Sequence, residues 1–312
     1  MTDAGAPNIA AKVSPYPAPA ADARPYGRRR FDGVKALATA STLISTGFAA
    51  LILLTLLVQS GPAVLNAGET ILTTRWNPQS GHYGIIPMVF GSLIVMAIAM
   101  IIALPIGLLA AIYIAETRSL RLKRAVKSAL EILAGIPSIV YGLIAVSSLS
   151  LWVADAFDLQ SGRVILTAGL ILSVMILPTF LSLTEDAISS VPRRYRENAY
   201  ALGLYRHEML TSALLPIAAP GIAGAALLAL GRALGETMAV MLVIGSIDRL
   251  PSPLFNVLTS GQTITSKLGR EIGESAFGST HFSALVLMSF LLVSVTLLLT
   301  LSARLLFTRA PK

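Results

Sequence analysis

The hydrophobic positions along the chain form long uninterrupted runs rather than short periodic stretches. Five windows contain no Asp, Glu, Lys or Arg, namely residues 36–68, 76–115, 132–154, 164–184 and 275–303. A sixth window, residues 209–247, is interrupted only by Arg232 and Glu236. Each window reaches the roughly 20 residues that cross a hydrocarbon core of about 30 Å. The pattern therefore predicts six membrane-spanning helices.

The expected organisation is a tail, a first helix and a core of five further helices. Residues 1–33 contain mostly Ala, Pro and Arg and are predicted to form a disordered tail. Residues 34–60 form the first helix, which is too long for the apolar region of a signal peptide and is expected to stay uncleaved. The core covers residues 85–307, with spans at about 85–115, 130–153, 164–183, 214–245 and 282–306.

Prolines lie inside several of these spans. Pro105, Pro137 and Pro178 each free a backbone carbonyl that only neighbouring helices, hydroxyl groups or water can satisfy within a membrane. The spans are therefore expected to pack as a bundle, and the predicted fold class is an all-α polytopic membrane protein.

The amino-acid composition limits the classes of function that the protein can have. Of 312 residues, 54% are hydrophobic and 13% are charged, and the mean hydropathy is +0.74. Soluble proteins carry about 25% charged residues, which argues against a soluble enzyme. The absence of cysteine excludes disulfides and thiolate ligands, and His82, His207 and His281 lie far apart. No metal site and no cofactor are predicted.

The basic residues are distributed unevenly between the loops. If the N-terminus is cytoplasmic, 18 of the 24 Lys and Arg residues lie on the cytoplasmic side, five lie outside and Arg232 lies within a span. Positive residues prefer the cytoplasmic side, so both termini are predicted to be cytoplasmic. The net charge of +8 is then explained by the orientation of the chain in the membrane, and no nucleic-acid partner is predicted from it.

The loop between the fourth and fifth spans, residues 185–210, has a recognisable pattern. Pro192 near a helix start and Gly203 after good helix formers predict a short amphipathic helix, a turn and a second helix. The loop resembles the pattern Glu-Ala-Ala, three residues, Gly, nine residues, Ile, one residue, Leu-Pro of permease subunits of ABC importers. The matching residues are Glu197, Ala199, Gly203, Leu215 and Pro216, whereas Asn198 and Ala213 depart from it.

That resemblance implies a coupling helix that docks onto an ATPase subunit. The coupling residues that it implies are Glu197, Asn198, Ala199, Gly203, Leu215 and Pro216. The chain itself is not expected to be an enzyme. Gly261–Lys267 superficially resembles a phosphate loop, but it lacks the second glycine and the Lys-Ser/Thr ending. ATP hydrolysis is therefore expected on a separate polypeptide.

Two charges interrupt the fifth span. An arginine or a carboxylate at the centre of a membrane helix costs roughly 2.5–3.5 kcal/mol on insertion scales. Arg232 and Glu236 are four residues apart, so on one helix they are predicted to lie one turn apart and to neutralise each other. Either the pair is structural, or the Arg232 guanidinium meets an anion in transit. Gly231 and Gly235 would allow close approach to the backbone.

Residues 231–240 resemble the signature of the phosphate-specific ABC importer permease, and of its C-type subunit in particular. Residues 84–87, 104–116 and 134–142 are also similar to that family. The resemblance implies a type I importer permease fold in a bacterial inner membrane. It also implies a substrate pathway for inorganic phosphate lined by Arg232, Glu236, Gly231, Gly235 and Thr237.

The partners implied by this resemblance are a homologous second permease, two ATPase subunits and an extracytoplasmic phosphate-binding protein. The outer segment Ile247–Thr280 is long enough to contact the binding protein, although a plain surface loop explains it equally well. A permease for another oxyanion, such as sulfate or molybdate, is a second hypothesis. A membrane channel or scaffold without an ATPase is a third, and the Glu197–Pro216 pattern disfavours it.

Overall fold

The computed structural model describes residues 28–117 and 119–308, with side chains described for residues 33–117 and 119–301. The chain divides into two units, Met1–Ile52 and Leu53–Lys312. The described part of the first unit is entirely helical and belongs to α1 (Arg28–Ile71). Residues 28–33, predicted as part of the tail, are therefore helical. The remaining tail residues, 1–27, lie outside the described residues.

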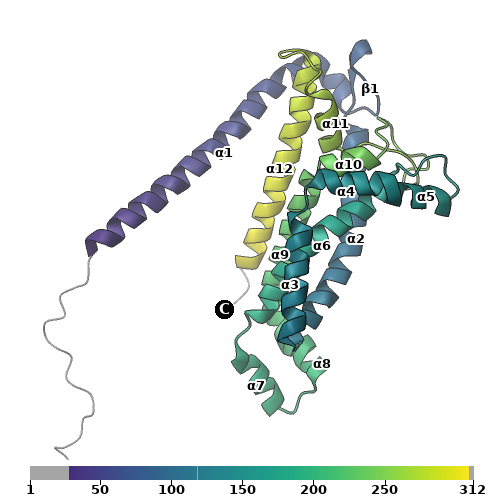
Figure 1. Ribbon diagram of the computed structural model, residues 1–312. Helices are drawn as coiled ribbons and strands as arrows, with labels where there is room; N and C mark the ends of the chain where they lie inside the picture. Colours follow the sequence, from purple (N-terminus) through teal and green to yellow (C-terminus); the bar gives the residue numbers. More distant parts are fainter. Residues whose placement is uncertain (1–27, 118, 309–312) are drawn as a thin grey trace, which may run out of the picture. The chain divides into compact units, whose positions relative to one another are not determined.

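The second unit is built almost entirely from helices (Figure 1). After α1, the elements in chain order are β1 (Trp76–Asn77), the 3-10 turn η2 (Pro78–Ser80), β2 (His82–Tyr83), α2 (Ile86–Glu116), α3 (Leu120–Gly135), α4 (Ser138–Ile144), the π turn η3 (Ala145–Leu149), α5 (Ser150–Ala156), α6 (Ile165–Ser189), α7 (Arg193–Ala201), α8 (Arg206–Met209), the π turn η4 (Leu210–Leu214), α9 (Leu215–Gly235), α10 (Met238–Val243), α11 (Ile264–Glu271) and α12 (Thr280–Thr308). The two short strands pair antiparallel, with Trp76 opposite Tyr83.

Six helical segments within the described residues are long and apolar enough to cross a membrane, which confirms the predicted number of spans. They are Gly33–Ile71, Ile86–Glu116, Ser138–Ala156, Ile165–Ser189, Arg206–Gly235 and Thr280–Leu301.

The limits of the first and third spans differ from the prediction. The first helix continues past residue 60 and through Pro62 to Ile71, because Ala63, Ala67 and Ile71 are buried in a cluster with Trp76. The third span does not run unbroken from Leu130, because Pro137 has no N–H and forces an extended conformation on Ile136.

The fifth span is also shifted relative to its predicted range of 214–245. Its helix begins at Arg206 and ends at Gly235, and α10 is a separate short helix. The π turn η4 immediately precedes α9 and Pro216. Since proline cannot donate a backbone hydrogen bond, an already interrupted ladder accommodates it with little further loss.

Helix α6 is the centre of the bundle. In its most apolar window 67% of residues are buried, against 28% or fewer in the other five spans. Phe180, Ile176 and Leu172 of α6 lie in the main hydrophobic cluster with residues of α2, α4, α9 and α10. Gly107 of α2 faces the Phe180 ring at a distance that leaves no room for a side chain. This close approach holds α2 along α6.

The two ends of the second unit carry different elements (Figure 1). We call the end with α7 and α8 the α7 end, and the end with β1 and α11 the α11 end. At the α11 end, part of the outer segment Ile247–Thr280 is internal, because every residue from Gly261 to Lys267 is buried. Thr263 caps α11 by accepting a hydrogen bond from the Ser266 N–H at 3.2 Å.

Candidate functional site

The two predicted charges of the fifth span lie on either side of a helix break. Helix α9 ends at Gly235, and Glu236 has an extended backbone with ψ of 125°. Arg232 and Glu236 form no ion pair or hydrogen bond with each other in the described part of the chain. The prediction of a mutually neutralising pair one turn apart is therefore wrong, because the helical geometry that would join them stops between them.

Glu236 has other partners. Its Oε1 accepts a hydrogen bond from the Ala239 N–H at 3.2 Å, in the first turn of α10. A carboxylate is favourable there because the N-terminus of a helix carries partial positive charge. The backbone carbonyl of Glu236 accepts a hydrogen bond from Thr265 Oγ1 at 2.7 Å. The break is thus held by α10 on one side and by the start of α11 on the other.

Arg232 has no such partner. Its side chain is exposed, and it makes no hydrogen bond or ion pair with any residue that the structure describes. It lies in the last turn of α9, where a positive charge is favoured by the helix dipole. An unpaired guanidinium inside a bilayer is nevertheless costly, by up to roughly 2.5–3.5 kcal/mol at the centre of a membrane helix. The Arg232 guanidinium therefore needs an anion or water from outside this chain to offset that cost.

The small residues beside Arg232 leave its surroundings open. A Cβ atom added to Gly231 or Gly235 would meet nothing within 4 Å. Thr237 is half-buried and donates from Oγ1 to the Gly235 carbonyl at 3.4 Å. The structure thus brings these three residues to the same break as Arg232. Their role in binding a substrate stays a prediction.

The predicted coupling loop forms a helix, a turn and a second helix, as expected. Gly203 makes the turn between α7 and α8 with φ of +78°, a conformation that side-chain-bearing residues rarely adopt. Ala199 is the buried residue of α7, and Glu197 and Asn198 are exposed. Leu215 and Pro216 lie twelve or more residues further on, at the start of α9 rather than in the loop.

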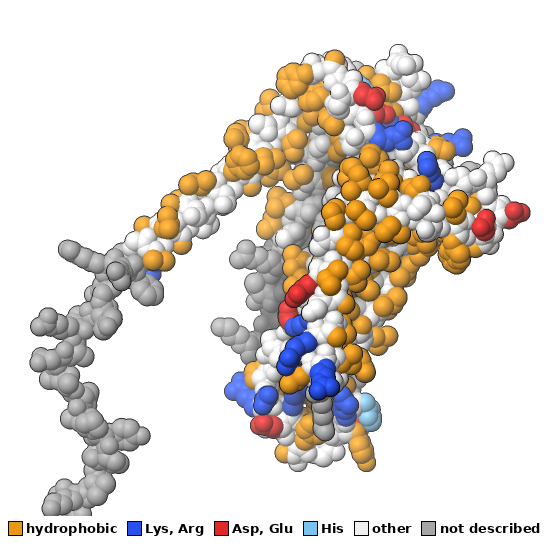
Figure 2. Space-filling model, viewed as in Figure 1, with side chains coloured by type: hydrophobic (Ala, Val, Ile, Leu, Met, Phe, Trp, Pro, Cys, Tyr) orange, Lys and Arg blue, Asp and Glu red, His pale blue; other side chains and the backbone are white. Residues whose placement is uncertain are grey.

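The outer face of this loop carries large apolar side chains. Leu202 is 81% exposed, and Tyr205, Tyr200 and Tyr195 are also exposed. Lys and Arg side chains gather at the same end of the unit (Figure 2). An exposed apolar group surrounded by charge is typical of a protein-binding surface.

A buried carboxylate that the sequence did not single out lies near this end. Glu185 of α6 is 1% exposed and forms ion pairs with Lys123 and Lys127 of α3, each at 2.6 Å. The pKa of Lys127 is raised, mainly because its ammonium group donates a hydrogen bond to the Glu185 carboxylate. Partial burial opposes this rise, and a hydrogen bond to Asp186 adds to it. The neutralised carboxylate allows α6 to continue past Leu183, where the predicted span ended.

A second unpredicted cluster lies at the α11 end. Lys267 is buried and forms ion pairs with Asp248 and Glu271, and its ammonium group lies 4.9 Å from the centre of the Trp76 ring. Glu271 also accepts hydrogen bonds from Trp76 Nε1 at 3.2 Å and His281 Nε2 at 3.0 Å. The cluster joins the hairpin, α11, α12 and the segment after α10. The sequence analysis did not predict this cluster, because its members are up to 195 residues apart in the chain.

This cluster predicts a pH dependence. Burial raises the pKa of Glu271, but hydrogen bonds from Lys267 and His281 outweigh it and hold the pKa below the usual 4.5. The stabilisation that the ionised Glu271 side chain provides is therefore present above this usual pKa of 4.5 and is lost as pH falls through the lower folded value. When the pH is lowered from 5 to 3, we expect the unfolding temperature of the purified parental protein to fall further than that of the Glu271→Gln variant. Equal shifts in the two proteins would contradict this.

Comparison with known proteins identifies the family. Residues 103–310 match the family described as "Binding-protein-dependent transport system inner membrane component". The chain is 35% identical over 280 residues to the "Phosphate transport system permease protein PstC" of Haemophilus influenzae, covering 83% of this chain and 87% of that protein. It is 35% identical over 243 residues to the "Probable ABC transporter permease protein YqgH" of Bacillus subtilis, covering 77% and 78%.

Solved structures show the same fold at lower identity. A bacterial ABC transporter involved in the import of the acidic polysaccharide alginate matches with a TM-score of 0.60 and 16% identity, over 91% of this chain and all of that one. A MetNI methionine ABC transporter in an inward-facing conformation matches with a TM-score of 0.52 and 18% identity, over 76% of this chain and all of that one. With six membrane-spanning helices and the type I ABC importer permease fold, the chain belongs to the binding-protein-dependent transport system inner membrane component family.

Proposed function

We propose that this chain forms part of the translocation pathway for inorganic phosphate in an ATP-driven importer. The observation that carries the proposal is Arg232, an exposed and unpartnered guanidinium on a membrane-crossing helix. Its burial in a bilayer is costly unless an anion or water meets it. Phosphate fits the guanidinium because two of its oxygens accept the paired, planar N–H donors.

The surroundings of Arg232 support a small anion. Gly231 and Gly235 leave open space, so an anion can approach the helix closely. The carboxylate of Glu236 does not pair with Arg232, which leaves the positive charge available. Relatives named for phosphate transport, at 35% identity, favour phosphate over another oxyanion.

The direct test is uptake by the complete transporter. The chain, a second permease, the ATPase and the binding protein are reconstituted in vesicles, and uptake of radiolabelled phosphate is followed with and without ATP. We expect ATP-dependent phosphate accumulation that excess unlabelled sulfate or molybdate does not reduce. Accumulation of sulfate or molybdate instead of phosphate would support the second hypothesis and overturn this one.

The α7 end is proposed as the contact with the ATPase. Its exposed side chains, Leu202 and three tyrosines, lie outside the apolar spans, where lipid does not cover them. Contact with a protein partner removes this apolar surface from water, at about 25 cal/mol for each Å². Glu197 and Asn198 lie exposed on the same short helix and are placed at that contact.

Substitution of Gly203 tests this contact. Gly203→Glu forces a side chain into a left-handed conformation, so the turn between α7 and α8 should distort. We expect co-purification of the ATPase and phosphate uptake to fall together, by about tenfold. Gly203→Asn is the matched control, since asparagine tolerates this conformation, and it should retain most of both activities. Full association and uptake in Gly203→Glu would mean that the turn is an ordinary connection.

The same proposal sets the orientation. Among the described residues of the second unit, more Lys and Arg side chains lie at the α7 end than at the α11 end, so the α7 end is placed in the cytoplasm, together with both termini. The α11 end then faces the binding protein, and the exposed apolar spans face lipid and the homologous second permease in a bacterial inner membrane.

Reporter fusions measure this orientation. Fusions after Thr74, Thr117, Asp158, Ser190, Ser260 and Lys312 are expected to report outside, inside, outside, inside, outside and inside in that order. Thr74 follows the end of α1, so the first reporter lies beyond the first span. An exported reporter at Lys312 would contradict the proposed topology.

A further inference from the structure

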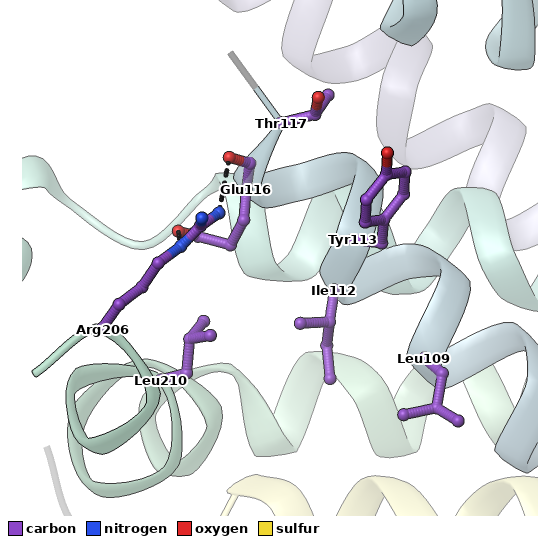
Figure 3. A pocket seen from close by; sticks show the side chains of 7 residues that line it. All are labelled: Leu109, Ile112, Tyr113, Glu116, Thr117, Arg206 and Leu210. Carbon is purple, nitrogen blue, oxygen red and sulfur yellow. Dashed lines mark hydrogen bonds and ion pairs between the residues drawn. The ribbon is translucent and has the colours of Figure 1, made fainter. Parts of the chain in front are cut away.

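A single carboxylate joins the α7 end of the bundle to α2. Glu116 is the last residue of α2, and its side chain is 9% exposed. One carboxylate oxygen accepts a hydrogen bond from Arg196 of α7, and the other lies 3.8 Å from Nε of Arg206. Arg206 Nη2 also donates to the Glu116 backbone carbonyl at 3.0 Å. Figure 3 shows Arg206 reaching from the start of α8 to this carboxylate.

The position of Glu116 is unfavourable without these partners. The C-terminus of a helix carries partial negative charge, so a carboxylate there is repelled by the α2 carbonyls. Partial burial adds to the cost of the charge. Arg196 and Arg206 lie 80 and 90 residues further along the chain, one on each side of the turn at Gly203. The carboxylate therefore depends on both arms of the loop.

Apolar contacts extend the same junction. Ala199, on the inner face of α7, is buried in a cluster with Met209 and Leu214, against which Ile112 and Ala115 of α2 pack. Arg196 and Ala199 are three residues apart and so lie on one face of α7. The exposed residues Glu197, Asn198 and Leu202 are left free for a partner. Helix α7 thus has one face that packs toward α2, the end of α6 and the turn η4, and one exposed face that is available to another protein.

The covalent connections of α7 are less regular than this junction. Between α6 and α7 the chain passes through Pro192 in an extended conformation, with ψ of 139°. Between α7 and α9 it passes through Tyr205, with ψ of 161°, and then through the π turn η4. Each interrupts the hydrogen-bond ladder of a regular helix. The ion pairs at Glu116 therefore connect α7 to α2 by a route that does not run through these irregular backbone segments.

Helix α2 reaches from this junction to the candidate substrate site. It has 31 residues, which corresponds to roughly 46 Å of helix. Near its other end, Ser92 Oγ accepts a hydrogen bond from the Ile264 N–H at 2.9 Å. The next residue, Thr265, donates to the Glu236 carbonyl at the break beside Arg232. One helix therefore contacts both the coupling turn and the segment that holds the Glu236 backbone.

We propose that Glu116 is a positioning residue that transmits displacement of α7 to α2, and through α2 to the break at Glu236. The inference rests on the proposed docking of the ATPase at α7. In this mechanism the arginines bind the carboxylate throughout the cycle, and α2 moves with α7. Without the carboxylate, α7 moves with the ATPase while α2 lags behind.

The first test compares Glu116→Gln with Glu131→Gln, an exposed glutamate of α3, in the reconstituted transporter. We expect the Glu116 variant to retain its ATPase subunit but to move about tenfold less phosphate per ATP hydrolysed. The Glu131 variant should keep the parental ratio. Glu116→Gln with Arg196→Gln should be no worse than Glu116→Gln alone, since Arg196→Gln removes a contact that the first substitution has already weakened. Additive losses, or a parental ratio in Glu116→Gln, would overturn the proposal.

The second test measures movement directly and covers the case in which Glu116→Gln assembles poorly. The chain has no cysteine, so spin labels attach specifically to cysteines introduced at Ala201 in α7 and Leu109 in α2. Both positions are exposed. We expect the distance between the labels to stay constant on ATP binding in the parental protein and in Glu116→Asp, and to change in Glu116→Gln. The same constant distance in Glu116→Gln would overturn the proposal.

The two tests separate this inference from the proposed function. A parental complex that moves no phosphate would overturn phosphate as the substrate, while the label distances would still test Glu116. A parental complex that moves phosphate, combined with unchanged label distances in Glu116→Gln, would overturn the role of Glu116 alone.

Discussion

Replacing Arg232 with glutamine is expected to abolish phosphate uptake while the protein still inserts and assembles. The side chain has no partner among the described residues, so its removal breaks no ion pair that holds the bundle together. Insertion should even improve slightly, since a charge in the membrane is costly. Uptake should fall by at least about a hundredfold, because charge-assisted contacts of this kind are worth roughly 1.5–3 kcal/mol each. Uptake of radiolabelled phosphate, normalised to co-purified ATPase, measures the effect.

Two further variants separate charge from geometry at this site. Arg232→Lys keeps the charge but loses the paired planar donors, and it should transport at an intermediate rate. Glu236→Gln keeps an oxygen that can accept from the Ala239 N–H, so its loss should be smaller than that of Arg232→Gln. The double variant Arg232→Gln with Glu236→Gln should remain inactive, because the two residues are not paired. Parental uptake by Arg232→Gln or by the double variant would refute the assignment.

Replacing Lys267 with methionine is expected to have the largest effect on stability. The substitution leaves two carboxylates, Asp248 and Glu271, without the ammonium group between them. Removing one partner of a buried ion pair costs about 3–5 kcal/mol, and the lower end applies here because both carboxylates are about a quarter exposed. The contact of the ammonium group with the Trp76 ring is lost as well. Thermal unfolding of the purified protein at pH 7 measures the change.

A neighbouring basic residue provides the control. Arg270 lies on the same helix and is exposed, so Arg270→Met should change the free energy of unfolding by no more than about 0.5 kcal/mol. Adding Asp248→Asn and Glu271→Gln to Lys267→Met removes the unpaired charges and should restore much of the stability. Equal stability of Lys267→Met and the parental protein would show that the ion pairs do not stabilise the α11 end.

The sequence alone determined the features that depend on local composition. Long charge-free runs predicted six spans, because a bilayer excludes charge along a whole helix length. Pro192 and Gly203 predicted the helix and turn of the coupling loop, because each restricts or permits particular backbone angles. The matching residues of this loop and of the segment around Arg232 indicated the family that the comparisons confirm.

Only the tertiary structure decided which charges meet. Spacing suggested that Arg232 and Glu236 pair, but the break after Gly235 separates them. The pairs that do form join distant segments, as between Glu116 and Arg196. No local pattern marks such pairs, because their energy comes from the three-dimensional approach of side chains that each cost free energy when buried alone. The sequence determines where charges occur along the chain, and the packing of the helices determines which of them are neutralised and which, like Arg232, have no hydrogen-bond or ion-pair partner among the described residues.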